Sequence, residues 1–480
     1  MKLISLEFLL LSLFTFLLYR AFPKRTRWVI LLISSLIFYC FSGLFSLILI
    51  VLFTLSSYML ALILQGASRR EGVFCGKENQ GRGFFLCAFG CITLIAAFLL
   101  VRELSPIGAL GISFYSLRIV SYLVDVYGGR VKAEKNLLKY ALFSSFFPLA
   151  FLGPVTLYQQ INETLYKGES VGFDDIMTAL FRISYGVFKK LVIANALARP
   201  LIYMSEATDI YYGAYVLFII IFYTLQVFCD FSGGIDICIG LSGLFGVKLP
   251  ENFNRPFLST SAREFWNRWH ITLGEWLEKY VFYPFSFSKA MQGFSKGCRK
   301  RLGVRMGKRL PLYAATMLTW LLTGLWHGFK GHFVAWGLLN GAIVLISRET
   351  KRKKERALGN ALSRVRVFFI IGAVRILDLY KSFTLSLKLL VGMLLHPFAS
   401  HPSWEGFFEA IAPDILFIVI CALLVTLVIG NAREFCEKKA KKPFVVILGT
   451  VLLMICTLVF GTYGQGFDAS DFIYSHFNGG

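Results

Sequence analysis

The sequence has little charge for its length. Only 16% of its 480 residues are charged and 56% are hydrophobic, whereas about a quarter of a typical soluble domain is charged. This composition excludes an ordinary soluble protein and predicts a chain that crosses a membrane several times. The formal net charge of +22 does not indicate nucleic-acid binding, because Lys and Arg occur in short clusters between apolar runs, as in cytoplasmic loops.

Motifs for metals and nucleotides are also missing. The ten cysteines contain no CxxC pair, so neither a zinc cage nor a disulfide framework is supported. No HExxH pattern occurs, and the separation of His327 and His332 does not suit two metal ligands on one helix, so we expect no metal site. The absence of a P-loop excludes an NTPase.

Long apolar runs are what the sequence does contain, and about 20 such residues cross a bilayer. We expect spans or long helical segments near 4–20, 28–43, 46–65, 84–101, 107–126, 139–157, 174–198, 213–230, 312–327, 332–348, 366–395 (continuous or broken), 412–430 and 443–461. The segments 234–247 and 262–285 are more polar or interrupted, and we expect re-entrant or interfacial helices there. The first run has no cleavage site, so we expect it to be retained.

The predicted fold class is therefore an all-α polytopic membrane protein with about 11–13 membrane helices. Its orientation follows from clusters of Lys and Arg, which favour the cytoplasmic side. These clusters lie at 24–27, 69–82, 130–139, 296–309, 348–356 and 433–442. Placing all six inside puts both termini outside, and the tail 464–480, which has two Asp and no Lys or Arg, agrees with this orientation.

Two of the basic clusters, 296–309 and 348–356, allow two interpretations. Basic segments beside a membrane bind anionic headgroups, which is the simpler interpretation. The same clusters would also suit docking of an acidic acyl donor, such as the phosphates of coenzyme A or an acidic carrier protein.

Histidine is scarce, and two of the six histidines directly follow a tryptophan. His270 lies in the segment 262–285, whose apolar positions recur at helical spacing, so we expect one amphipathic helix with Glu264 paired to Arg268. The aromatic side of this helix also fits a purely interfacial role. A histidine with an ordinary pKa of about 6.5 can exchange a proton near neutral pH.

His327 ends a strongly apolar run and has Gly324 and Gly328 on either side. Ionisable groups at membrane depth are costly and indicate a functional site by default. We expect the glycines to let a substrate approach, and this end of the run to face the outer side. A structural histidine at the interface is the alternative.

A third group of polar residues interrupts the apolar run 223–240, where Gly233 and Gly234 would permit a break. These polar residues are Gln226, Asp230 and Asp236. Buried carboxylates need partners, and the candidates are Arg255, Arg263 and Arg268. Structural ion pairs and a substrate-lining role both remain open.

Several phrases together resemble the membrane-bound O-acyltransferase family, in its bacterial branch that acetylates alginate and D-alanylates teichoic acid. They are GISFYSLRIVSYLVDVY at 111–127, FFPLAFLGPV at 146–155, LQVFCDFSGGIDICIGL at 225–241, ENFNRPFLSTSAREFWNRWHITLGEWL at 251–277, LTGLWHG at 322–328 and DFIYSHF at 471–477. The resemblance runs from the N-terminus to about residue 345 and returns at the tail.

This resemblance implies a ring of tilted helices around a central funnel. It implies one membrane domain, 1–463, with a catalytic core near 105–348 and an extracytoplasmic tail at 464–480. His327 corresponds to the catalytic histidine and His270 to the second conserved position. Tyr474 matches the tyrosine of the family's FIY ending, an acyl acceptor or relay.

The sequence departs from the bacterial branch at two places. Glu278-Lys279 stands where Arg-Asp is usual, so an ion pair made there must be rearranged or reversed. Gly233-Gly234-Ile235 replaces Gly-Tyr-Ser, which changes the expected contacts near Asp236.

The mechanism that we expect is acyl transfer from a thioester to a hydroxyl. His327 would be the general base, and His270, with Trp266 and Asn267, would position the donor or the oxyanion. Further expected lining residues are Gln226, Asp230, Asp236 and Trp326.

The first functional prediction is transfer of an acetyl group from cytoplasmic acetyl-CoA, across a bacterial cell membrane, toward an exported polysaccharide. A secreted SGNH-type acyltransferase is the expected partner, with no resident cofactor and no nucleic acid. The alternative is D-alanyl transfer from a carrier protein to teichoic acid. A transporter without covalent chemistry is a third interpretation, and it leaves the two Trp-His motifs without a reason.

Overall fold

The structure is a computed structural model, and it describes residues 3–69, 77–104, 111–349, 357–398, 413–424 and 443–462. These residues form helices joined by loops. Within them the extended pairing is a single antiparallel bridge between Phe253 and Trp269. The predicted all-α class is confirmed.

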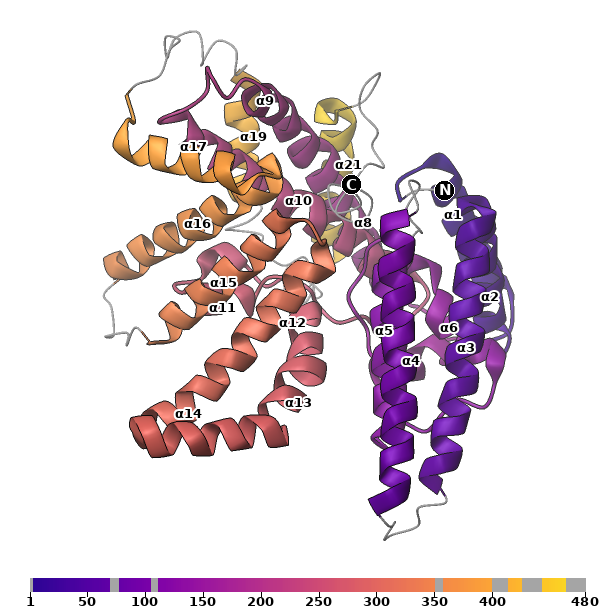
Figure 1. Cartoon of the computed structure of the whole chain (residues 1–480). Helices are drawn as coiled ribbons and strands as arrows, with labels where there is room; N and C mark the ends of the chain where they lie inside the picture. The colour runs from indigo at the N-terminus through magenta and orange to yellow at the C-terminus, as the bar shows by residue number, and fades with distance from the viewer. Residues whose placement is uncertain are drawn as a thin grey trace.

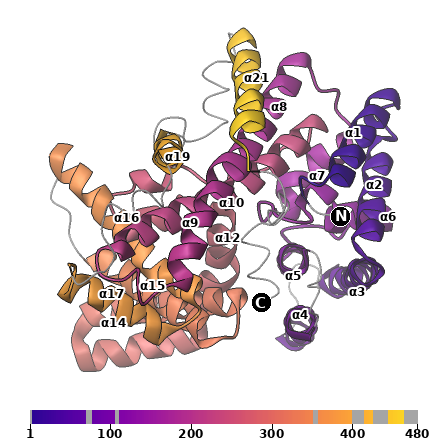
Figure 2. The same cartoon turned by 90° about the horizontal axis from the view of Figure 1, so that it is seen from above.

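The N-terminal part is a group of helices that pack on one another. They are α1 (Leu6–Ala21), α2 (Arg27–Ser42), α3 (Leu44–Arg69), α4 (Lys77–Leu104), α5 (Ile112–Tyr127), α6 (Leu137–Ser145) and α7 (Tyr158–Lys167). Helices α3, α4 and α5 run side by side, which is clear when they are seen lengthwise in Figure 1 and end-on in Figure 2.

The middle of the chain begins with α8 (Phe173–Phe188), which continues through a π-helical segment, η2 (Lys189–Ala194), into α9 (Asn195–Glu206). Helix α10 (Tyr215–Leu244) follows and packs against α8, α9 and η2. The predicted long helical segment 174–198 is therefore present and extends further.

The remaining helices form the orange and yellow part of Figure 1 and the short segments before it. They are α11 (Ala262–Trp266), α12 (Ile271–Leu277), the π-helical η4 (Glu278–Phe282), α13 (Tyr283–Ser286), α14 (Lys289–His327), α15 (Gly331–Glu349), α16 (Ala357–Tyr380), α17 (Phe383–Leu395), α19 (Pro413–Leu424) and α21 (Pro443–Phe460). The segment 366–395 is broken between α16 and α17, at Lys381 and Ser382.

Four helical segments in the described part of the chain are long and apolar enough to cross a membrane, namely Leu44–Gly66, Gly83–Arg102, Tyr215–Leu244 and Pro443–Phe460. They overlap the spans predicted near 46–65, 84–101, 213–230 and 443–461. The most apolar window of α10 is 83% buried, whereas that of α21 is 17% buried. Helix α10 is therefore the central helix, and α21 presents most of its surface outward.

The break that Gly233 and Gly234 would permit does not occur, because α10 is continuous through them. A Cβ atom on Gly233 would lie 2.8 Å from the carbonyl oxygen of Gly186, and one on Gly240 would lie 2.8 Å from that of Ala179. These glycines let the backbones of α8 and α10 approach closely, as small residues do between membrane helices. The re-entrant segment predicted at 234–247 is the end of α10.

Two other predicted helices are shorter or divided. The expected span 139–157 consists of α6, a short 3-10 turn at Phe147–Leu149 and irregular backbone. Proline at Pro148 and Pro154 cannot donate to a continuing helix. The amphipathic helix expected over 262–285 is divided between α11 and α12, and the division falls at His270.

Candidate active site

A cavity of about 480 Å³ lies between α11, α12, α14, α15 and α16. His270 and His327 both line it, although they come from separate segments of the chain. Trp266 and Asn267 line it too, as the sequence predicted, whereas Trp326 is not among its lining residues. The cavity therefore unites four of the predicted site residues.

His270 has a backbone conformation that is rare for a residue with a side chain. Its φ and ψ are both 50°, in the left-handed region, and it precedes the first turn of α12. Such conformations cost free energy and persist only where the surroundings fix them. The antiparallel pairing supplies that support, because Asn254 N–H donates to the Arg268 carbonyl (2.9 Å) and Ile271 N–H to the Asn252 carbonyl (3.0 Å).

The imidazole of His270 is buried, with 6% of the residue exposed. Its Nδ1 lies 3.2 Å from Oδ1 of Asn252. Its ring packs edge-on against Phe231 of α10, with centroids 4.9 Å apart, and lies 6.3 Å from the ring of Trp326. One side of His270 is thus held by protein while the residue also borders the cavity.

His327 is the last residue of α14, and its ring lies between aromatic rings. The centroid distances are 4.9 Å to Trp326 and 5.0 Å to Trp336 of α15. Arg102 of α4 donates a 2.7 Å hydrogen bond to the Trp326 carbonyl. That bond satisfies one of the carbonyls left over at a helix C-terminus and fixes the end of α14.

The prediction that glycines beside His327 let a substrate approach was wrong in its geometry. A Cβ atom on Gly324 would lie 2.5 Å from the Phe333 carbonyl oxygen, and one on Gly328 would lie 2.3 Å from the Phe333 ring. Both glycines therefore allow α15 to pack closely on α14 rather than opening space next to the histidine.

Tryptophans form a wall of the cavity beside His327. Trp266 and Trp320 are 4.8 Å apart between ring centroids, and Trp266 and Trp336 are 5.8 Å apart. All three line the cavity. The rings make this part of the cavity apolar, which suits a reaction that must exclude water.

Arg375 and Asp378 of α16 also line the cavity, and the sequence analysis missed them. The guanidinium of Arg375 lies 4.1 Å from the ring centroid of Trp269, within the range of a cation–π contact. The sequence could have predicted these two residues. An Arg and an Asp three residues apart interrupt the apolar run of α16, and charges inside membrane helices indicate function.

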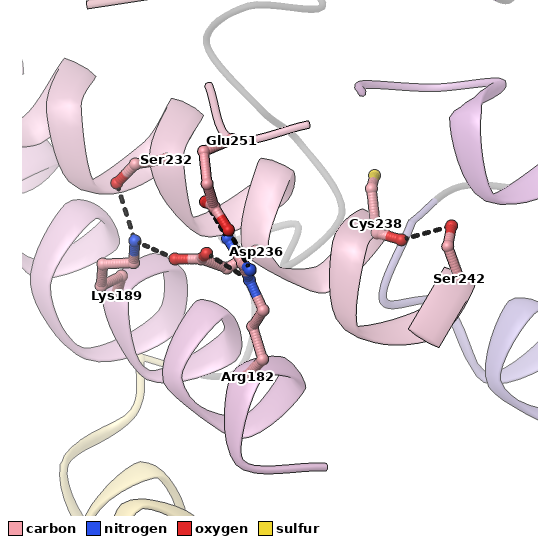
Figure 3. A network of polar contacts seen from close by, with 7 residues as sticks. All are labelled: Arg182, Lys189, Ser232, Asp236, Cys238, Ser242 and Glu251. Carbon is pink, nitrogen blue, oxygen red and sulfur yellow. Dashed lines mark hydrogen bonds and ion pairs between the residues drawn. The ribbon is translucent and has the colours of Figure 1, made fainter. Parts of the chain in front are cut away.

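The carboxylates of α10 lie away from the cavity lining. Asp236 accepts from Arg182 Nε (2.9 Å) and from Lys189 Nζ (2.5 Å), as Figure 3 shows. Asp230 accepts from Lys190 Nζ (2.6 Å). The predicted arginine partners of Asp236 were wrong, because its cations come from α8 and η2. Gln226 is buried, and it too is not among the lining residues.

Two neighbouring pairs of charged residues lie in the segment 262–285. Arg268 lies 2.8 Å from Glu264, so the predicted i,i+4 pair is confirmed. At the unusual Glu278-Lys279 pair, Lys279 Nζ lies 3.0 Å from Asp125 of α5, and Tyr283 donates to Glu278 (2.8 Å). Glu278 and Lys279 therefore interact with different partners rather than with each other. Tyr474 lies outside the described residues.

The chain contains two G-x-S-x-G sequences, at 168–172 and 293–297, a pattern that positions the nucleophile of some hydrolases. The second lies inside α14 and the first links α7 to α8, whereas the hydrolase motif joins a strand to a helix. Arg27 donates to the Gly168 carbonyl (3.0 Å) and to Ser170 Oγ (3.1 Å). The loop thus ties α2 to α8.

Comparison with known proteins identifies the family. Residues 131–296 match the sequence profile of the membrane-bound O-acyltransferases. A probable alginate O-acetylase of Azotobacter vinelandii is 33% identical over 368 residues, which cover 71% of this chain and 67% of that protein. The chain belongs to the membrane-bound O-acyltransferase family.

Two further relatives of this chain are named for transfer to peptidoglycan and to teichoic acid. The peptidoglycan O-acetyltransferase of Helicobacter pylori is 30% identical and covers 59% of this chain and 56% of that protein. The teichoic acid D-alanyltransferase of Bacillus subtilis is 26% identical and covers 57% and 70%. The alignments with the alginate O-acetylases span about two thirds of their length, with 67% and 66% for two of them.

Proposed function

We propose that this membrane O-acyltransferase moves an acetyl group from acetyl-CoA on the cytoplasmic side to a hydroxyl on the way to an extracytoplasmic polysaccharide. The observation that carries the proposal is the pairing of His270 and His327 at one cavity in a membrane protein. The alginate and peptidoglycan O-acetylating relatives support acetyl as the group transferred.

In the proposed reaction, His327 accepts the proton of the acceptor hydroxyl while the hydroxyl oxygen attacks the thioester carbonyl. The tetrahedral intermediate then collapses, the carbon–sulfur bond breaks, and the thiolate takes up a proton. General-base catalysis of this kind contributes about a hundred- to ten-thousand-fold. The apolar wall of Trp266, Trp320 and Trp336 keeps water from hydrolysing the donor.

The direct test uses the full chain in lipid vesicles with radiolabelled acetyl-CoA and a soluble polysaccharide acceptor or a partner acetyltransferase. We expect His327→Ala to reduce transfer at least about a hundred-fold while the protein stays folded and inserted. His332→Ala is the matched control, since His332 is nearby in sequence but does not line the cavity. Undiminished transfer by His327→Ala would exclude the assignment.

D-Alanyl transfer to teichoic acid is the alternative, and it rests on the more distant relative. It predicts that a D-alanyl carrier protein, rather than acetyl-CoA, loads the acceptor in the same vesicles. The proposal also includes a secreted SGNH-type partner and a relay role for Tyr474. The relay fails if Tyr474→Phe is fully active and mass spectrometry finds no acylated tail.

A further inference from the structure

We propose that Asn252 is a positioning residue that fixes His270 in the tautomer with its proton on Nδ1, so that neutral His270 acts only as an acceptor through Nε2. The catalytic part of this inference rests on the proposed function. The tautomer itself does not, because it follows from the contacts around one amide oxygen.

The side-chain atom of Asn252 that faces His270 is its amide oxygen. Thr272 N–H donates to this atom (3.1 Å), and a backbone N–H can only donate. The Thr272 hydroxyl lies 2.8 Å from the same atom, and it can donate to this atom while it accepts from Val155 N–H (2.9 Å). The atom is therefore the amide oxygen, since an NH₂ group in its place would face the Thr272 N–H donor.

This amide oxygen determines which ring nitrogen of His270 carries the proton. An amide oxygen accepts and cannot donate, so a hydrogen bond across the 3.2 Å to His270 Nδ1 requires the proton on that nitrogen. The second ring nitrogen of a histidine is set by the hydrogen bond that the first one makes. Neutral His270 then carries its lone pair on Nε2.

The surroundings of Asn252 keep its side chain from turning away from His270. The residue is 0% exposed, and its backbone carbonyl is held by Ile271 N–H. Its neighbour Glu251 accepts two hydrogen bonds from Arg182, at 2.6 and 2.5 Å. Figure 3 shows this clamp continuing from Arg182 to Asp236 and Lys189.

The charges of this clamp balance, with two cations, Arg182 and Lys189, against two carboxylates, Asp236 and Glu251. Buried ions persist when they are paired and hydrogen-bonded. The clamp connects α8 and α10 to the segment that carries Asn252. Asp236 of α10, which does not line the cavity, therefore supports the segment that carries Asn252.

The chemical consequence concerns the partner of His270 in the reaction. A neutral imidazole with its proton on Nδ1 cannot donate from Nε2, so it does not stabilise an oxyanion there. It accepts from an O–H or N–H group, such as the acceptor hydroxyl or an amide of the donor's pantetheine arm. This replaces the oxyanion role that the sequence had left open for His270.

The test is solid-state NMR of the full chain in lipid bilayers, labelled with ¹³C and ¹⁵N at its six histidines. At about pH 8, above the ordinary histidine pKa, the ring shifts show which nitrogen carries the proton. The His270→Gln spectrum identifies the His270 signals by their loss. We expect His270 in the wild-type chain to be protonated on Nδ1, and protonation on Nε2 would overturn the proposal.

Substitutions at Asn252 separate its acceptor role from its bulk. Asn252→Leu removes the acceptor, and we expect a mixture of tautomers and a fall in kcat of about a hundred-fold, with less effect on KM. Asn252→Asp keeps an acceptor, and we expect the Nδ1 tautomer and most of the activity to return. Asn254→Ala is the matched control, because Asn254 is exposed on the same segment.

Each result bears on one of the two claims. If Asn252→Leu keeps the Nδ1 tautomer as fully as Asn254→Ala does, Asn252 does not set the tautomer. If Asn252→Leu fails to fold, the wild-type and Asn252→Asp spectra still decide the assignment. A wild-type chain with the Nδ1 tautomer but no acyl transfer from any thioester would refute the proposed function and leave the tautomer intact.

Discussion

His270 and His327 follow tryptophan in the same way in the sequence, yet the structure holds them by different means. His270 sits at a left-handed backbone position, fixed by an antiparallel pairing and by buried polar residues behind it. His327 ends a long helix and is fixed by aromatic rings and close backbone packing. The shared Trp-His dipeptide therefore does not determine how each histidine is held, because the residues that hold it come from elsewhere in the chain.

The largest expected effect comes from removing the charge behind His270. Arg182→Met leaves Glu251 and Asp236 without one of their cations inside the protein, and breaking a buried ion pair this way costs about 3–5 kcal/mol. The free energy of unfolding, measured by denaturation in mixed micelles, should fall by this amount.

The matched control for Arg182 is Arg268→Met. The Arg268 and Glu264 side chains are each 32% exposed, whereas that of Arg182 is 9% exposed. An exposed pair contributes about 0–1 kcal/mol. Equal losses for the two variants would mean that the buried clamp does not hold the His270 side.

A smaller effect is expected on the His327 side, where packing and not charge gives the support. Gly324→Ala places a methyl group against the Phe333 carbonyl, and overpacking of this kind costs about 1–3 kcal/mol. The unfolding measurement should show this loss together with lower transfer activity.

Gly392 provides the comparison for Gly324. It lies within α17 and has open space at its Cβ position, so Gly392→Ala should stabilise the helix by up to about 1 kcal/mol. If Gly324→Ala behaved like Gly392→Ala, close packing between α14 and α15 would not be what fixes His327.

The smallest effect concerns the backbone of His270 itself. Both His270→Gly and His270→Ala remove the imidazole, but glycine adopts a positive φ without the penalty of about 1–2 kcal/mol that a Cβ atom brings. We expect the glycine variant to be more stable by about 1 kcal/mol. The same comparison at Thr272, whose φ is helical within α12, should favour alanine. A more stable alanine variant at His270 would argue against strain there.

Local patterns in the sequence predicted what depends on neighbouring residues. Apolar runs predicted α3 and α4, and i,i+4 spacing predicted the pair of Glu264 and Arg268. The partner of Asp236 could not be predicted this way, because Arg182 is 54 residues away. Glycine was ambiguous for the same reason, since Gly233 permits either a break or a close neighbour.

The candidate site shows the same division. The two histidines, Trp266 and Asn267 could be named from their motifs. The left-handed backbone of His270 could not, because it depends on pairing with Phe253 and its neighbours. Arg375 and Asp378 could have been found from charge inside an apolar helix, and they were overlooked within a predicted span.

The hydrogen bond from Arg102 to the Trp326 carbonyl joins residues 224 positions apart. During synthesis, α4 is complete long before the ribosome reaches the end of α14. The fixed end of α14, and with it the position of His327, is therefore established only when a late segment docks on a helix that is already in the membrane. A chain interrupted before the end of α14 would therefore lack both His327 and the bond that fixes its position.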